Sequence, residues 1–485
     1  MGIVLKQSIR NTAITYFGFG IGALNTLFLY TQILEPAYYG LVTLILATAA
    51  ILMPLMAFGT HNTIIKYYSA QPDGGKNSFL TLMLLSPLLL LVPMALATYF
   101  LYDDIGHFLA KKNAIVYDYV WYIFVVGLAM AYFEVYYAWS KVHLKSVFGN
   151  FMKEVFVRLG VSLLLTALYF DVLELHTFFK ALVALYLVRT IIMQCYAYNL
   201  RKRKLDFNFP KNTKEILTYS LLIILGGSAA LVLLEIDKFM INQFVALENV
   251  AFYGVAIYIA TVIIVPSRSM HQITYPLTAT LLNNNDMKGL RALYKKTSLT
   301  LFIASGLLYL LIILNVNDLF EMLPEPYRGG FYIIALIGLA KVTDSLLGNN
   351  NSILYNSKYY KVVLGFGASL AIVTILLNLW LIPIYGIEGA ALASFVAIVV
   401  FNVLKLAYVK LKFDMLPFSQ GSFKILVTLI LIGILFWYLQ FPFHPLVNIV
   451  FKSLLITLMY GGILYRFNIS EDVSGLLARF LKRNT

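Results

Sequence analysis

The stretch FFKALVALYLVRTIIMQCYAYN, residues 178–199, is long and apolar enough to cross a lipid bilayer as one helix. Such a helix needs about 20 mainly apolar residues. Arg189 lies about 10 residues from either end of the stretch, which at ~1.5 Å per residue places its charge ~15 Å from water. A charge at that depth costs about 2.5–3.5 kcal/mol, so it should face a cavity or a partner. The stretch therefore predicts both a membrane span and a functional residue.

The rest of the chain has the same character. Its 485 residues are 60% hydrophobic and only 12% charged, whereas a soluble domain carries about 25% charged residues. We therefore expect an all-α integral membrane protein with about 14 transmembrane helices. The predicted spans are 11–33, 41–65, 79–101, 119–140, 155–172, 178–199, 217–236, 250–268, 297–316, 329–350, 361–382, 387–409, 423–440 and 446–465.

A basic loop divides these spans into two groups of six, followed by two more. We expect an N-terminal six-helix lobe over residues 1–200, a basic cytoplasmic linker over 201–216 and a C-terminal six-helix lobe over 217–410. A glutamate followed by Tyr-Gly opens both the second and the eighth spans, which suits two lobes related by a pseudo-two-fold axis. Residues 411–485 then hold two extra transmembrane helices and a cytoplasmic amphipathic tail.

The distribution of lysine and arginine predicts the orientation. With the N-terminus inside, 27 of the 37 Lys and Arg residues lie in cytoplasmic segments, 4 in outer loops and 6 within spans. The positive-inside bias of membrane proteins produces this asymmetry, so we expect both termini in the cytoplasm. The formal charge of +14 then faces anionic inner-leaflet lipid, and we expect no nucleic-acid partner.

Other charged residues inside spans are the best functional candidates. Glu134, in the fourth span, either pairs with Arg189, pairs with an arginine until substrate or a proton arrives, or belongs to an aromatic belt near the interface. Arg158 lies about one turn inside the fifth span, where it can snorkel to the headgroups. Lys341 and Asp344 share one face of the tenth span, as a self-neutralised pair or as one that an ion or substrate opens.

Enzymatic and metal motifs are absent from the sequence. It contains no GxxxxGK[ST], HExxH or GxSxG pattern, and the single Cys195 excludes an intramolecular disulfide. The outer loops 102–118 and 317–328 are short for a membrane polymerase, so we expect no enzyme, no catalytic residue and no metal or cofactor. Glu235 and Asp237 close the seventh predicted span, either as outer-interface residues or as a cation site.

One segment resembles a family signature. Residues 378–393 read NLWLIPIYGIEGAALA, similar to the N-x-x-L-I-P-x-x-G-x-x-G-A-A-x-A pattern of the polysaccharide-transport family. That family belongs to the superfamily of MATE exporters and MurJ flippases. Tyr39-Gly40, and Ile236-Asp237-Lys238 followed by Tyr253-Gly254, resemble two more of its patterns.

The resemblance implies a Wzx-type flippase of the bacterial inner membrane. Such a protein moves a polyprenyl-pyrophosphate-linked oligosaccharide outward by alternating access, for O-antigen, capsule or exopolysaccharide synthesis. Its expected partners are that lipid-linked oligosaccharide, membrane lipids and polysaccharide assembly proteins. A MATE-like cation-coupled small-molecule exporter and a lipid II flippase are the alternatives.

Taken together with this resemblance, the positions of the charged and polar residues within the predicted spans place the candidate site residues in two groups. They are Arg189, Arg158, Glu134 and Lys341 for a cavity that holds the pyrophosphate headgroup, and Asp237, Asp344 and Asn378 for coupling to Na⁺ or H⁺.

Overall fold

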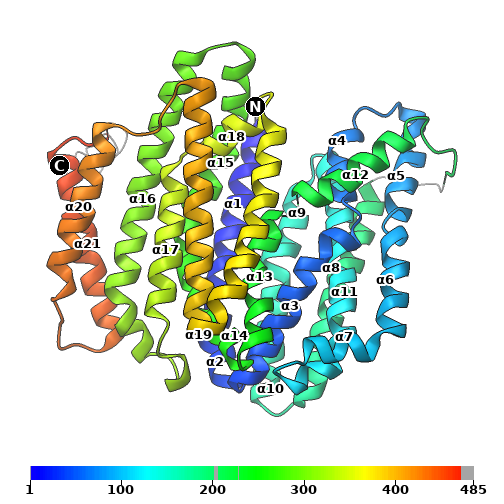
Figure 1. Ribbon diagram of the computed structural model, residues 1–485, viewed down its shortest axis with the longest axis horizontal. Coiled ribbons are helices and arrows are strands. Elements are labelled where there is room, and N and C mark those ends of the chain that lie inside the picture. The colour runs from blue at the N-terminus through cyan, green and yellow to red at the C-terminus, as the bar shows by residue number, and fades with distance from the viewer. Residues whose placement is uncertain (1, 201–205, 228, 471–485) are drawn as a thin grey trace. The chain divides into compact units, whose positions relative to one another are not determined.

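The computed structural model describes residues 2–200, 206–227 and 229–470, and every regular element within these ranges is helical (Figure 1). The predicted all-α class is thereby confirmed. The amphipathic tail predicted beyond Ser470 and the linker residues 201–205 lie outside the described residues.

Contacts along the backbone divide the chain into two compact units. Unit 1 comprises Met1–Gly254 and Asn378–Gly386, and unit 2 comprises Val255–Leu377 and Ile387–Thr485. The predicted lobe boundaries stay a prediction.

The described helices of unit 1 include two wide π-helical turns, η1 and η4. In chain order they are α1 (Gly2–Ala23), η1 (Leu24–Leu29), α2 (Tyr30–Ile33), α3 (Pro36–Met56), α4 (Thr60–Tyr67), η2 (Asp73–Gly75), α5 (Lys76–Leu85), α6 (Leu88–Phe100), α7 (Tyr102–Leu109), η3 (Ala114–Tyr119), α8 (Val120–Val142), α9 (Ser146–Phe151), η4 (Met152–Phe156), α10 (Val157–Tyr169), α11 (Leu175–Leu200), α12 (Thr213–Gly227), α13 (Ala229–Phe244) and α14 (Glu248–Thr261), which passes into unit 2 after Gly254.

Unit 2 contains the longest helices of the chain. They are η5 (Val262–Ile264), α15 (Val265–Asn283), α16 (Met287–Glu321), η6 (Glu325–Tyr327), α17 (Phe331–Leu346), α18 (Asn350–Tyr355), α19 (Tyr360–Phe413), α20 (Gln420–Trp437) and α21 (Pro445–Arg466), with residues 378–386 of α19 belonging to unit 1.

The lengths of these helices suit a membrane. Ten helical segments of the described residues are long and apolar enough to cross a bilayer, which supports a multi-pass membrane protein. The predicted number of about fourteen spans stays a prediction. One of the ten segments, Lys361–Phe413, covers two predicted spans, 361–382 and 387–409.

A turn at Gly386 separates those two spans within α19. Gly386 has φ 58° and ψ −135°, far from helical values, and Pro383 precedes it. A positive φ of this kind is open to glycine because it has no Cβ, and proline removes a helical hydrogen bond. The first glycine of the NLWLIPIYGIEGAALA segment therefore allows the chain to bend between two helical parts of α19.

A second break interrupts the second predicted span, 41–65. Helix α3 ends at Met56, two residues after Pro54, and α4 begins at Thr60. Between them Gly59 adopts φ 63°, and a Cβ there would collide with the carbonyl oxygen of Ser220 on α12. The break thus lets α12 approach the backbone closely.

Each unit is organised around one central helix. In unit 1, α8 packs against α3, α4 and α11, and Trp139 of α8 is fully buried in that core. In unit 2, α16 packs against α15, α17, α20 and α21, and Phe302 and Tyr460 lie in the shared core. Polar side chains on α8, α11, α16 and α17 are therefore held by close helix contacts.

Candidate functional site

Arg189 lies on α11 of unit 1 and is only 6% exposed. Its guanidinium carbon is 4.1 Å from the ring centroid of Phe133 and 4.8 Å from that of Tyr186. A cation over an aromatic face is attracted by the negative charge of that face. Its Nε has no hydrogen-bond partner among the described residues. The two aromatic rings therefore hold the guanidinium of Arg189 in place, and its Nε–H remains available to donate a hydrogen bond.

One of the alternatives, an ion pair between Arg189 and Glu134, is not found among the described residues. The carboxylate of Glu134 pairs with Lys153 of η4 at 2.5 Å, and no ion pair to Arg189 occurs within the described ranges. The reason is helical rotation, because consecutive residues of an α-helix point about 100° apart. Phe133 contacts Arg189, so the next residue along α8 faces another direction.

Arg158 is paired locally. Its guanidinium lies 3.0 Å from the carboxylate of Glu154, one turn earlier, and it also donates to the Glu154 carbonyl. Asn25 of η1 donates to the Arg158 carbonyl at 2.8 Å and accepts a hydrogen bond from Ser162. The π-helical turn in α1–α2 thereby anchors α10, and the charge of Arg158 is balanced by a carboxylate of its own helical segment.

Asp237 forms a buried polar cluster in unit 1. Tyr253 of α14 donates to its Oδ2 at 2.6 Å, and Asn378 of α19 donates to its Oδ1 at 2.7 Å. All three side chains are buried, and the Oδ1 of Asn378 carries no hydrogen bond to any described residue. The cluster joins three helices through hydrogen bonds that α14 and α19 donate to the carboxylate of α13.

Helix α13 continues beyond Asp237 to Phe244, and the predicted place of Asp237 at the end of a span stays a prediction. Glu235, which was expected beside it, pairs instead with Lys238 at 2.7 Å.

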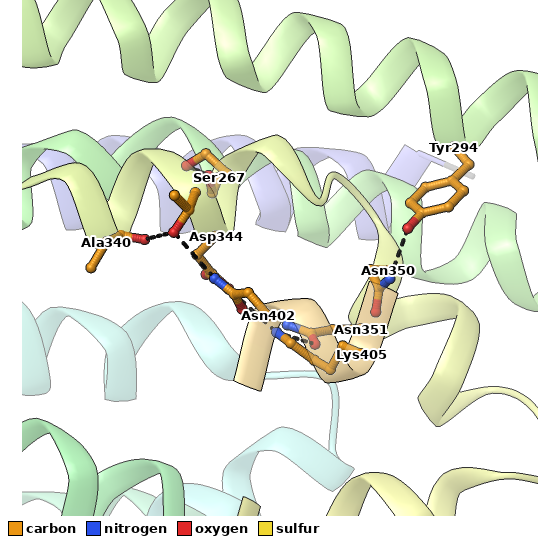
Figure 2. A network of polar contacts seen from close by, with 10 residues as sticks. Ser267, Tyr294, Ala340, Asp344, Asn350, Asn351, Asn402 and Lys405 are labelled. Carbon is orange, nitrogen blue, oxygen red and sulfur yellow. Dashed lines mark hydrogen bonds and ion pairs between the residues drawn. The ribbon is translucent and has the colours of Figure 1, made fainter. Parts of the chain in front are cut away.

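A second polar network lies in unit 2 (Figure 2). Lys405 of α19 is 2% exposed, and its Nζ lies 3.4 Å from the Asp344 carboxylate of α17 and 3.2 Å from the Asn351 amide oxygen of α18. Asn402, one turn before Lys405, donates to Thr343 at 3.4 Å. The network links three helices through one neutralised charge pair.

The network shows which residues sequence reasoning missed. Asp344 was expected to pair with Lys341, which lies one turn earlier on α17. The structure shows an ion pair between Asp344 and Lys405 of the neighbouring helix α19. A lysine inside a predicted span was the only available signal for Lys405. Tyr253 carried a signal only through the family-like pattern that it shares with Asp237, and that pattern did not predict a hydrogen bond between them.

Around this network further polar contacts cross between the helices of unit 2. The hydroxyls of Ser267 and Ser345 are 3.0 Å apart, and Asn350 donates to the hydroxyl of Tyr294 at 2.7 Å (Figure 2). No group of three or more His, Cys, Asp or Glu side chains suited to a metal ion occurs in the part of the chain that the structure describes.

Solved transporters share this arrangement of helices. The lipid II flippase MurJ, in an inward closed conformation, aligns with a TM-score of 0.69 at 12% identity over 95% of this chain and 100% of its own. A multidrug resistance MATE family transporter of the MOP superfamily, inward-facing, aligns with a TM-score of 0.64 at 15% identity over 84% of this chain and 98% of its own. A MOP superfamily transporter from Pyrococcus furiosus aligns with a TM-score of 0.60 at 12% identity over 85% of this chain and 95% of its own. At these identities the likeness shows the fold alone.

Sequence comparison supplies the family. No curated protein is similar enough in sequence to match the chain. Residues 4–282, more than half of the chain, match the model of a family described as "Polysaccharide biosynthesis protein". The chain belongs to this polysaccharide biosynthesis protein family and has the fold of MOP superfamily transporters.

Proposed function

We propose that this protein is a flippase that moves a polyprenyl-pyrophosphate-linked oligosaccharide from the inner to the outer leaflet by alternating access. The product would serve O-antigen, capsule or exopolysaccharide synthesis. Membership of a polysaccharide biosynthesis family and a flippase-type transporter fold support the general class. We further propose that the protein lies in the bacterial inner membrane with both termini in the cytoplasm and has no enzymatic activity.

The observation that carries the proposal is the state of Arg189. Its charge is buried at 6% exposure, is held by aromatic rings and is balanced by no carboxylate of the described residues within ion-pair distance. Keeping a charge in a membrane span is costly, so a charge that is kept there is a candidate functional residue. A pyrophosphate offers two charged groups, and the planar guanidinium fork suits bidentate binding of phosphate oxygens.

The same physics explains why a carrier is needed. Sugars and pyrophosphate cannot enter the hydrocarbon core without losing their hydration. A polar path beside the lipid lets the polyprenyl tail stay in the bilayer, while a cation offsets desolvation of the phosphates. In this proposal Arg189 is the main headgroup residue, and Arg158, Glu134 and Lys341 are secondary residues.

Coupling to a monovalent cation is the second part of the proposal. Asp237, whose carboxylate accepts from Tyr253 and Asn378, would take up Na⁺ or H⁺ and change these hydrogen bonds. Asp344 is a second candidate, because its pair with Lys405 is partly open to solvent. Membrane lipids and polysaccharide assembly proteins are the proposed partners, and no nucleic acid is expected.

The test is a complementation experiment in a strain that lacks the gene. Polyprenyl lipids are extracted and identified by mass spectrometry, and surface polysaccharide is measured in parallel. We expect the deletion strain to accumulate a polyprenyl-pyrophosphate oligosaccharide, and Arg189→Ala to export about 10–100 times less than wild type, the effect of losing a charged hydrogen bond. Arg189→Lys should retain part of the export, because it keeps the charge without the planar fork.

The matched control is Arg291→Ala, whose side chain is 50% exposed and lies near Asp414. It should export like wild type, and all variants should insert normally in the membrane. Full export by Arg189→Ala would contradict the role of this residue. Unchanged lipids after deletion, in a strain without a redundant transporter, would favour a small-molecule exporter instead.

A further inference from the structure

A pocket of about 330 Å³ lies within unit 2, away from the polar network of Asp344. Its walls are the last turns of α16, the end of α20 with the loop that follows, and the first turns of α21. In the predicted orientation these helix ends meet at the outer face of the membrane.

Two helices, α16 and α21, present polar side chains to this pocket. Asp318 and Glu321 are three residues apart at the end of α16, and Asn448 and Lys452 are four residues apart at the start of α21. Residues with these spacings lie on one face of a helix. The pocket therefore has a carboxylate wall and an amide–ammonium wall.

The amide–ammonium wall is buried and keeps unused hydrogen-bond capacity. Lys452 is 6% exposed and donates to the Leu314 carbonyl at 2.6 Å, which occupies one of the three donors of an ammonium group. Asn448 is 8% exposed and donates to Asp318 at 3.2 Å and to the Phe441 carbonyl at 2.9 Å. Its Oδ1 has no partner among the described residues. Donors and an acceptor thus remain available beside one cavity.

Aromatic rings complete the lining. Trp437 ends α20 with its side chain 50% exposed, and the rings of Phe441 and Phe443 lie nearly parallel with centroids 6.3 Å apart. Aromatic faces are electron-rich and attract positively polarised groups, including the C–H groups on one face of a sugar ring.

The charged side chains that line the pocket limit the chemical class of ligand that it can bind. Asp318 and Glu321 against Lys452 leave the pocket with one net negative charge, which disfavours phosphate and other anions. The ammonium of Lys452 in turn disfavours a metal cation at the same place. A ring with several hydroxyls, which both donates and accepts hydrogen bonds, satisfies all the groups present.

We infer that this pocket binds a neutral or amino-bearing sugar of the exported oligosaccharide at the outer face of the C-terminal helix pair. The inference rests on the proposed flippase function and adds a subsite to it. Arg189 would hold the anionic headgroup, whereas this pocket would hold sugar units after they reach the outer side.

Saturation-transfer NMR on the full-length protein in nanodiscs tests the inference. The probes are glucose, glucosamine and N-acetylglucosamine at millimolar concentration, with sodium pyrophosphate as an anionic comparison. We expect signals from sugar ring protons, which Trp437→Ala weakens about five- to tenfold through loss of the aromatic face. Asp318→Asn should weaken binding of glucosamine more than that of glucose, because it removes a negative charge that attracts the amine.

Trp380→Ala is the matched control, since Trp380 is a 65% exposed tryptophan outside the pocket. Equal signals from Trp437→Ala and Trp380→Ala, or no signal from any of the three sugars, would overturn the inference. Pyrophosphate should not compete with the sugars, and competition would also count against it.

The same measurement separates this inference from the proposed function. Arg189→Ala should bind the sugars like wild type even though it fails to export lipid-linked oligosaccharide. If the deletion strain accumulates the lipid but the protein binds no sugar, the flippase function is supported and the sugar subsite is rejected. If sugar binding depends on Trp437 but the deletion strain accumulates no lipid, the sugar subsite is supported and the flippase function is rejected.

Discussion

Arg189 of unit 1 and Lys405 of unit 2 are both cations buried in helices of a membrane protein, but their surroundings differ. Lys405 has a carboxylate, Asp344, at 3.4 Å and an amide oxygen at 3.2 Å. Arg189 has the rings of Phe133 and Tyr186, and within the described residues it has no ion pair. A paired cation stabilises the fold around it, whereas a cation held only by rings stays available to an anion. The comparison separates a charge that the structure neutralises, Lys405, from one for which we propose a binding role, Arg189.

Breaking the Lys405 pair should have the largest effect on stability. In Asp344→Ala the ammonium of Lys405, only 2% exposed, loses its counter-charge. Leaving a buried charge unpaired typically costs about 3–5 kcal/mol. We expect a large fall in thermal stability in nanodiscs, and Asp344→Ala combined with Lys405→Met should recover most of it. A single variant as stable as wild type would contradict the structural role of the pair.

Tyr253→Phe should have the next largest effect. It removes the hydroxyl that donates to Asp237 at 2.6 Å inside a buried cluster. A hydrogen bond to a charged group contributes about 1.5–3 kcal/mol, so stability should fall by that order. Thermal unfolding in Na⁺ and in choline buffers would show in addition whether Na⁺ stabilises wild type more than the variant. Equal Na⁺ stabilisation of both would show that the Tyr253 hydroxyl has no part in Na⁺ binding.

Arg189→Met sharpens the comparison in the opposite direction. The variant removes a costly buried charge and loses cation–π contacts of about 1–2 kcal/mol. We expect stability within about 1 kcal/mol of wild type, together with loss of export in the complementation assay. A destabilisation as large as that of Asp344→Ala would show that Arg189 is a structural charge as well.

The smallest effect concerns the corrected partner of Glu134. A double-mutant cycle with Glu134→Gln and Lys153→Met should give a coupling energy of about 0.2–1 kcal/mol, since the Lys153 side chain is 45% exposed and screened by solvent. The parallel cycle with Glu134→Gln and Arg189→Met should give a smaller value. A larger coupling to Arg189 would reverse the assignment.

Much of the fold followed from local patterns, and part of the site did too. The position of Arg189 in an apolar stretch marked it as unusual, and a Tyr-Gly pattern marked Tyr253 without assigning it a partner. The ion pairs that the structure shows for Glu134 and Asp344 were not predicted from the sequence. Glu134 pairs with Lys153, and Asp344 pairs with Lys405 sixty-one residues away, because partners are chosen across helices and not along them.

The sequence by itself determined that this is a helical membrane protein, because each apolar stretch must satisfy its backbone hydrogen bonds within itself in lipid. It also determined where the chain bends, since proline and glycine act on the residues next to them. Only the tertiary structure decided which intramembrane charges are neutralised. Pairing depends on how each helix is rotated about its axis and on which helices are neighbours, and a rotation of about 100° per residue changes the partner.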